Sequence, residues 1–370
     1  MFPLPDPGSW PASRLVERAG RYADETWLRQ RPPLEFCTPN HVAHETAAMR
    51  LRVFAVDATS ETAADALADT GGAGPTLLIV PPEVNRSTIV DFAPGQSLVR
   101  TAQAAGFHRV AVVQWRTATR ETARRDIDDS IADILDSLER LTQRSARPHL
   151  LGVCQGGWES AVAAAVRPEA VASLTLVAAP IDFHAGEGIL KHLSRFMPMA
   201  AYRSMTLAGR QRMPGSFISL GFDTLQPFER FFLKPLSVWN HTGGREDDEA
   251  WLARFHRLDD WYRAPKDLPG PLYLRAVREL FKENRLVQGR FTALGQRVDL
   301  GRITCPLCLV AGARDHITPP PQVFDARPCF GSRSVREVLT EGGHIGTFMG
   351  RRELTEHWPG ILDWLQQQTR

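Results

Sequence analysis

The residues around Cys154 have the composition of a nucleophile turn. The segment Gly152-Val153-Cys154-Gln155-Gly156 follows an apolar run and has the pattern glycine, any residue, nucleophile, any residue, glycine, in which serine is the usual nucleophile. A helix-forming run begins directly after Gly156, so the pattern predicts a thiol held on a strand-to-helix turn. The alternative is a buried structural cysteine at a strand end, because free cysteine is often buried.

Two residues further along the chain supply the partners that such a nucleophile needs. Asp315 lies in "VAGARDHITPP", just past an apolar run, and His344 lies in "LTEGGHIGTFMG", just past the next one. The order nucleophile, acid, histidine is that of α/β-hydrolases. Each residue alone could simply form a turn or pack in a loop, but together the three predict a Cys-His-Asp catalytic site. His316, beside Asp315, either orients that carboxylate or only packs.

An acyl-transfer site also needs hydrogen-bond donors for the oxyanion. The main-chain N–H of Gln155 is the expected first donor, because it belongs to the residue after the nucleophile. The second donor is expected in the loop that follows the strand at 76–80, around Glu83–Asn85, and Val84 and Asn85 are the candidates.

The elements that would position these residues alternate between strands and helices. Apolar, β-branched runs predict strands at 51–56, 76–80, 109–115, 149–154, 172–179, 305–312 and 336–340. Helical patterns lie near 95–105, 125–143, 156–166 and 352–367, and one helical face carries Ile127, Ile131, Ile134, Leu138 and Leu141. We therefore predict an α/β fold, with a mostly parallel sheet flanked by helices.

The alternation stops between about 185 and 300, where the sequence is aromatic and helical in pattern. We predict an N-terminal segment at 1–45 and a catalytic domain at 46–370 with a helical cap inserted at about 185–300. Trp251, Phe255, Leu258 and Tyr262 form one helical stripe. The stripe is either the inner face of the insertion or, in part, the lining of an acyl channel.

Composition limits the other possibilities. The net charge is +2, without a basic cluster, which argues against nucleic acid as a partner. We find neither a signal peptide nor an apolar run of the roughly 18–20 residues that would span a membrane, and we expect a cytoplasmic protein. The pair Cys305 and Cys308 is expected in the core rather than at a metal, and neither metal nor cofactor is expected.

The sequence resembles the polyhydroxyalkanoate synthases, cysteine acyltransferases that polymerise 3-hydroxyacyl groups supplied as CoA thioesters. The similarity extends from about residue 45 to the C-terminus and is carried by "PPEVNRSTIVDFAPGQSLVR", "VVQWR", "LLGVCQGG", "VAAPIDF", "MPGSFISLGF", "ARDHITPP" and "GGHIGTFMG". It implies that Cys154 carries the acyl group, that His344 is its base and that Asp315 assists the attacking hydroxyl. Trp158 and the pair Ser87-Thr88 depart from the family pattern, and we expect them near the entrance and the oxyanion loop.

The cysteine suits such a reaction, because an acyl group on sulfur remains a thioester that a hydroxyl can still attack. The resemblance implies the α/β-hydrolase fold, a 3-hydroxyacyl-CoA substrate and association with a polyester granule. The chain is similar to the short catalytic subunits of the family, which implies a homodimer or a complex with a second synthase subunit. Two alternatives stay open: a cysteine hydrolase, either thioesterase or intracellular depolymerase, and a non-catalytic granule-associated subunit.

Overall fold

The computed structural model describes residues 12–25, 29, 31–55, 74–143, 146–225, 238–242 and 246–368. The chain divides into two compact units. The smaller unit comprises Met1–Leu34 and Ile218–Ala264, and the larger comprises Glu35–Phe217 and Pro265–Arg370. Every predicted site residue belongs to the larger unit.

The larger unit is built on an eight-stranded sheet with the order β1-β2-β6-β3-β7-β8-β13-β14. Strand β2 runs antiparallel to both of its neighbours, and all pairs from β6 to β14 are parallel. The strands are β1 (His41–Glu45), β2 (Met49–Ala55), β3 (Thr76–Val80), β6 (Arg109–Trp115), β7 (His149–Val153), β8 (Ser173–Val177), β13 (Leu307–Gly312) and β14 (Val335–Thr340). This topology confirms the predicted mostly parallel α/β fold.

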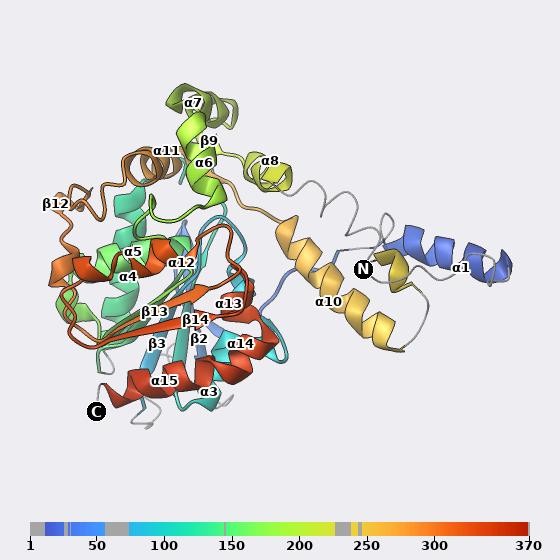
Figure 1. Cartoon of the computed structure of the whole chain (residues 1–370), viewed down its shortest axis with the longest axis horizontal. Coiled ribbons are helices and arrows are strands. Elements are labelled where there is room, and N and C mark those ends of the chain that lie inside the picture. Colours follow the sequence, from blue (N-terminus) through green and yellow to red (C-terminus); the bar gives the residue numbers. More distant parts are fainter. Residues whose placement is uncertain are drawn as a thin grey trace. The chain divides into compact units, whose positions relative to one another are not determined.

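Helices cover both faces of this sheet. In Figure 1 the strands lie between the pair α4 (Ile127–Thr142) and α5 (Gln155–Val166) and the pair α3 (Leu98–Ala104) and α15 (Trp358–Gln367). Strands β3, β7, β8 and β13 are therefore buried on both sides and consist of buried residues throughout. This burial on both faces explains why the sequence has continuous apolar runs at these strands.

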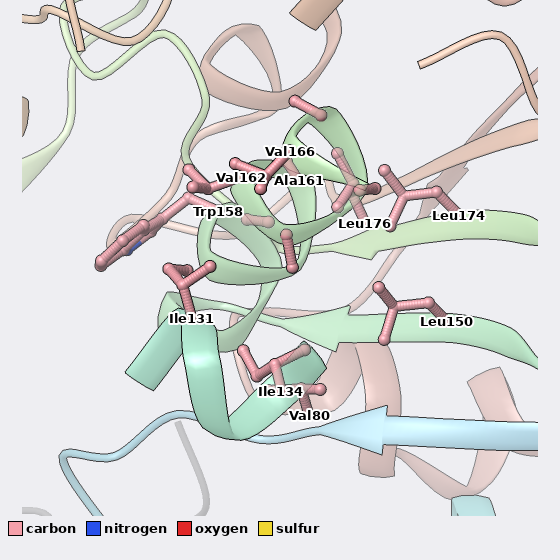
Figure 2. Close-up of a cluster of buried hydrophobic side chains, with 14 of the residues drawn as sticks. Val80, Ile131, Ile134, Leu150, Trp158, Ala161, Val162, Val166, Leu174 and Leu176 are labelled. Carbon is pink, nitrogen blue, oxygen red and sulfur yellow. The ribbon is translucent and has the colours of Figure 1, made fainter. Parts of the chain in front are cut away.

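The predicted apolar face of α4 is confirmed, because all five of its residues are completely buried. Ile131 and Ile134 lie in the hydrophobic cluster of Figure 2, together with Trp158 of α5. Trp158 is only 2% exposed. It is a core residue rather than part of an entrance, which corrects our expectation for this position.

Two elements differ from the prediction. Strand β1 lies inside the predicted N-terminal segment, and its weakly alternating sequence HVAHE is half-buried at the edge of the sheet. The predicted helix at 352–367 is two helices, α14 (Arg351–Glu356) and α15, which are separated at His357. Pro359 lies in the first turn of α15, because proline is tolerated there but disrupts a helix interior.

The predicted insertion is mostly helical where it is described, with two short β-ribbons. Its helices are α6 (Ile189–Phe196), α7 (Met199–Ala208), α8 (Gly215–Leu225), α10 (Glu246–Tyr262), α11 (Gly270–Arg275) and a π-helix at Ala276–Lys282. The predicted stripe on α10 is not its buried face, because Trp251, Phe255 and Leu258 are half-buried and Tyr262 is 42% exposed. The buried apolar residues of the helix are Leu252 and Trp261. Residues 226–237 of the apolar stretch Phe217–Trp239 lie outside the described residues.

Short elements complete the described chain. Helix α1 spans Ala12–Ala23, α12 spans Pro320–Phe324 and α13 spans Gly346–Met349. Single turns of 3₁₀-helix lie at Ser87–Val90, Pro168–Ala170, Leu300–Arg302 and Arg327–Cys329. Two-stranded ribbons are formed by β4 (Asp91–Ala93) with β5 (Gln96–Ser97), β9 (Arg212–Met213) with β10 (Leu268–Pro269) and β11 (Thr292–Ala293) with β12 (Gln296–Arg297).

Candidate active site

Cys154 occupies a strained turn between β7 and α5. Its φ of 54° and ψ of −119° lie in a region that residues other than glycine rarely adopt. Its N–H donates to the carbonyl oxygen of Val177 at 2.9 Å, which continues the sheet, and its carbonyl accepts from the N–H of Gly157 at 2.9 Å, which starts the helix. Strain of this kind persists only where the surrounding structure enforces it.

The two glycines of the motif are required by close backbone approach. A Cβ atom on Gly152 would lie 2.4 Å from the carbonyl oxygen of Gly156, and one on Gly156 would lie 2.1 Å from that of Val80. Both obstacles are main-chain atoms, which cannot rotate away as the end of a side chain can. The start of α5 is therefore pressed against the ends of β7 and β3, and this contact holds the turn.

Asp315 and His344 follow two adjacent strands, β13 and β14, and meet at the same edge of the sheet. Nδ1 of His344 lies 2.7 Å from Oδ2 of Asp315. The other carboxylate oxygen of Asp315 accepts from the N–H groups of Ile317 at 2.9 Å and Thr318 at 2.8 Å. The Asp315 side chain is completely buried, whereas that of His344 is 13% exposed.

The side chain of Cys154 also acts on the imidazole of His344. Burial lowers the pKa of the imidazole, but the interactions with Cys154 and Asp315 outweigh this effect and raise the pKa to about 10. The structure thus brings together all three residues of the predicted Cys-His-Asp site, which are distant in sequence.

The predicted oxyanion donors lie on two segments, the start of α5 and the loop after β3. Gln155 is the first residue of α5, where helical N–H groups lack an intrahelical acceptor. Val84 and Asn85 lie in the half-buried loop after β3; the carbonyl of Val84 accepts from the N–H of Lys266 at 3.4 Å, and the Asn85 side chain accepts from the N–H of Arg86 at 2.7 Å. Their role as donors stays a prediction.

Other predicted residues are placed as follows. His316 is exposed, and its main-chain carbonyl accepts from the N–H of Ile189 at 3.1 Å. Within the described residues it forms no side-chain hydrogen bond to Asp315, so its role stays a prediction. Cys308 is buried in β13, and desolvation raises the pKa of its thiol to about 12, as expected of a core cysteine.

Sequence reasoning missed three ionisable residues that are buried beside the nucleophile turn: Glu83, Glu159 and Lys266. The available signal was weak. Glu159 interrupts an otherwise apolar helix run, "WESAVAAAV", and Lys266 is one of only four lysines in the chain, at 191, 234, 266 and 282. Nothing in the sequence places the three together.

The described residues contain no group of three or more histidine, cysteine, aspartate or glutamate side chains arranged to hold a metal ion. None of their helices has both the length and the hydropathy required to cross a membrane.

The chain is similar to several proteins named "Poly(3-hydroxyalkanoate) polymerase subunit PhaC". The relative from Haloferax mediterranei is 27% identical over 338 residues, which cover 90% of this chain and 64% of that protein. The relative from Thiocystis violacea is 25% identical over 79% of this chain and 81% of its own length. The relative from Cupriavidus necator is 30% identical over 76% of this chain but 48% of its own length. The predicted resemblance to polyhydroxyalkanoate synthases is therefore confirmed.

Solved structures support the fold. A thermophilic esterase from Thermogutta terrifontis aligns over 90% of this chain and all of its own, with a TM-score of 0.53 and 14% sequence identity. At that identity the similarity shows the α/β-hydrolase architecture alone. Residues 86–329, which carry Cys154 and Asp315, match the family described as "Protein of unknown function (DUF3141)", and the chain belongs to that family.

Proposed function

We propose that this chain is a polyhydroxyalkanoate synthase, which transfers (R)-3-hydroxyacyl groups from CoA thioesters onto a growing polyester. The observation that carries the proposal is the strained Cys154 turn together with the hydrogen bond between His344 and Asp315, all at the carboxyl ends of parallel strands. The names of the polymerase relatives support the substrate class. The chemistry proposed below uses protein groups and the thioester substrate, without a metal or cofactor.

The first half-reaction loads Cys154. His344 accepts the proton of the thiol, and the resulting thiolate attacks the carbonyl carbon of the hydroxyacyl-CoA. The N–H of Gln155, with an N–H of Val84 or Asn85, stabilises the oxyanion. The bond to the CoA sulfur then breaks, CoA leaves as a thiol with the proton from His344, and the acyl group is bound to Sγ as a thioester.

The second half-reaction forms the ester. His344 accepts the proton of an attacking hydroxyl, the hydroxyl oxygen bonds to the acyl carbon, and the bond from that carbon to Sγ breaks. Cys154 is left as a thiolate beside the imidazolium, ready for the next thioester. The energy of the thioester is kept until this step, which explains why a cysteine replaces the usual serine.

Asp315 is proposed to act through His344. Its side chain is completely buried, and its oxygens accept from His344, Ile317 and Thr318. These contacts hold the imidazole in one orientation and stabilise its protonated form. They do not favour direct contact with the attacking hydroxyl, which was the role that the family resemblance implied.

Water must be excluded if the acyl group is to reach a hydroxyl rather than be hydrolysed. We propose that the helical insertion at about 185–300 serves as the cap. We also propose that the chain works in the cytoplasm at a polyester granule, as a homodimer or with a second subunit; the relatives are themselves named as subunits. Sedimentation of the purified chain with and without substrate tests the assembly.

The deciding experiment is incubation with 3-hydroxybutyryl-CoA, followed by separation of the product into insoluble polymer and free acid. Polymer with stoichiometric release of CoA is the expected result. Free 3-hydroxybutyrate alone would identify a cysteine hydrolase. No release of CoA at all would identify a non-catalytic subunit, and either of these outcomes would overturn the proposal.

A further inference from the structure

Three ionisable side chains are buried behind the Cys154 turn, and the proposed chemistry does not use them. Glu83 is 6% exposed, Glu159 is 0% exposed and Lys266 is 1% exposed. They come from three segments: Glu83 from the loop after β3, Glu159 from α5, and Lys266 from the stretch before β10. Charged groups are almost never this deeply buried unless they interact with one another or with specific partners.

Each group forms a hydrogen bond to a neutral partner. Glu83 Oε1 accepts from the hydroxyl of Ser130 on α4 at 2.6 Å. Glu159 Oε1 accepts from Nε2 of Gln155 at 3.0 Å, and its other carboxyl oxygen is buried without a hydrogen-bond partner among the described residues. Lys266 Nζ donates to the main-chain carbonyl of Trp115 at 3.1 Å.

The three groups also act on one another electrostatically. Burial raises the pKa of Glu83, while Ser130 and the charge of Lys266 oppose the rise. Burial raises the pKa of Glu159 well above its usual range, and the charges of Glu83 and Cys154 raise it further. Burial lowers the pKa of Lys266 to about 7, against the effect of Glu83. The other charges facing this cluster are Arg125 and Asp133 beside Glu83 and Arg86 beside Lys266.

One buried ammonium can neutralise one carboxylate. Glu83 is the carboxylate that shares Lys266, because Ser130 also stabilises its charged form. Glu159 is completely buried and also interacts with Lys266, but burial and the charge of Glu83 favour its neutral form, and one of its carboxyl oxygens has no hydrogen-bond partner among the described residues. With Glu159 neutral the cluster has no net charge, which keeps the cost of burying three ionisable groups low.

The cluster joins the segments that bear the oxyanion donors. Lys266 contacts the loop after β3 through its N–H, which donates to Val84 at 3.4 Å, and contacts the end of β6 through Nζ. The indole N–H of Trp115 in turn donates to the carbonyl of Pro81 at 2.9 Å. Val84, at one end of the segment 81–84, is therefore bonded to Lys266 itself. Pro81, at the other end, is bonded to Trp115, whose carbonyl accepts from the Lys266 side chain.

The same loop touches the nucleophile turn from the other side. Gly156 of α5 is packed against the carbonyls of Val80 and Pro81. Glu159, one helical turn after Gln155, holds the side chain of that residue. Any movement of the loop therefore changes the distance between the N–H of Gln155 and the N–H groups of Val84 and Asn85.

We propose that Lys266, Glu83 and Glu159 are positioning residues, which hold the oxyanion loop at 81–85 against the start of α5. The inference rests on the proposed acyl transfer for its catalytic consequence. Its structural content, a buried cluster of one amine and two carboxyl groups that act on one another, is independent of which acyl substrate the protein uses.

The test is a double-mutant cycle of Lys266→Met, Glu83→Gln and the two together. Acylation is followed as the burst of nitrophenol from a p-nitrophenyl ester, which needs no CoA substrate. We expect each single variant to lower the acylation rate constant by about tenfold to a hundredfold with little change in KM, because misplaced donors weaken transition-state binding more than ground-state binding. The double variant should recover at least about tenfold over Lys266→Met, because no unpaired charge remains.

Lys191→Met is the matched control. The Lys191 ammonium also donates to a main-chain carbonyl, that of Gly186, but it lies on α6 and is partly exposed. This variant should keep the acylation rate of the unmodified protein. An additive double variant, or a Lys266→Met protein with unchanged acylation, would overturn the proposal.

Two readouts separate this inference from the proposed function. The urea midpoints of the same four proteins should show the same rescue in the double variant, with no substrate present. The infrared band of a protonated carboxyl at pH 7 should disappear in Glu159→Gln, and its persistence would contradict the charge assignment. If the unmodified protein released no nitrophenol and no CoA, the proposed function would fail. The urea midpoints and the infrared spectrum would still decide whether Lys266, Glu83 and Glu159 are coupled in the folded protein.

Discussion

Nδ1 of His344 lies 2.7 Å from Oδ2 of Asp315 although 29 residues separate them in sequence. The contact exists because β13 and β14 are adjacent and parallel, so the loops after them leave the sheet at the same edge. Cys154 ends β7 at that edge as well. The site is therefore a consequence of strand order rather than of any local motif.

The first prediction concerns the nucleophile. Cys154→Ala removes the acyl acceptor, so release of CoA from 3-hydroxybutyryl-CoA should fall to background, while the circular dichroism spectrum stays unchanged. Cys154→Ser should be nearly as inactive, because a serine hydroxyl is far less acidic than a thiol and His344 has a weaker driving force to deprotonate it. Near-normal turnover in either variant would refute the assignment of Cys154.

The second prediction separates two roles for Asp315. If the carboxylate acts through His344, Asp315→Asn should slow loading of Cys154 and elongation alike, each by about a hundredfold or more. If it acts only on the attacking hydroxyl, the acyl group should load at a normal rate and then persist. Mass spectrometry of the intact protein after brief exposure to substrate distinguishes an unloaded protein from a stalled one, and a stalled acyl-protein would favour the hydroxyl role.

The contact between Asp315 and His344 could be predicted because it depends on the order of the strands. Cys154 and Asp315 each follow a continuous apolar run, and such runs mark strands buried on both faces. His344 follows β14, whose sequence VREVLT is only partly buried but is rich in β-branched residues. Strand β1 was missed because HVAHE is half-buried and has neither signal. The cluster of Glu83, Glu159 and Lys266 was missed for another reason: it depends on side chains from three distant segments, whose contacts no periodicity encodes.

The third prediction concerns the imidazole of His344. The negative charge of Cys154 is the main factor that raises its pKa to about 10 against the opposing effect of burial. In Cys154→Ala that charge is absent, and the pKa should fall by at least about one unit. Nuclear magnetic resonance of the histidine ring as a function of pH measures both values. An unchanged pKa would show that Asp315 alone sets the protonation of His344.

The fourth prediction tests the packing of the turn. Gly156→Ala would place a Cβ atom 2.1 Å from the carbonyl oxygen of Val80, and neither backbone can move without distorting the sheet. We expect the free energy of unfolding to fall by about 3 kcal/mol or more. Gly221→Ala on α8 is the control, because a Cβ atom there meets nothing within 4 Å, and it should be neutral or stabilising. Equal urea midpoints for both variants would contradict this account.

The last prediction concerns the pH dependence that Lys266 gives to stability. Burial lowers its pKa from the ordinary 10.5 to about 7. Between these two pH values the folded protein binds fewer protons than the unfolded chain, so the free energy of unfolding should rise with pH. Below about pH 7 both states hold the proton, and the cost of burying the ammonium is present in full.

In the Lys266→Met variant the free energy of unfolding should not show that rise with pH. The substitution also removes the positive charge that acts on Glu83. The pKa of Glu83 should then rise further, and a buried carboxyl with a raised pKa makes the folded state less stable as pH increases above its ordinary value of 4.5. Both effects have the same sign, so the difference in free energy of unfolding between the unmodified protein and Lys266→Met should grow with pH. Urea titrations at pH 6, 7.5 and 9 should show a growth of about 1–3 kcal/mol. A constant or shrinking difference would show that burial does not lower the pKa of Lys266 in the folded protein.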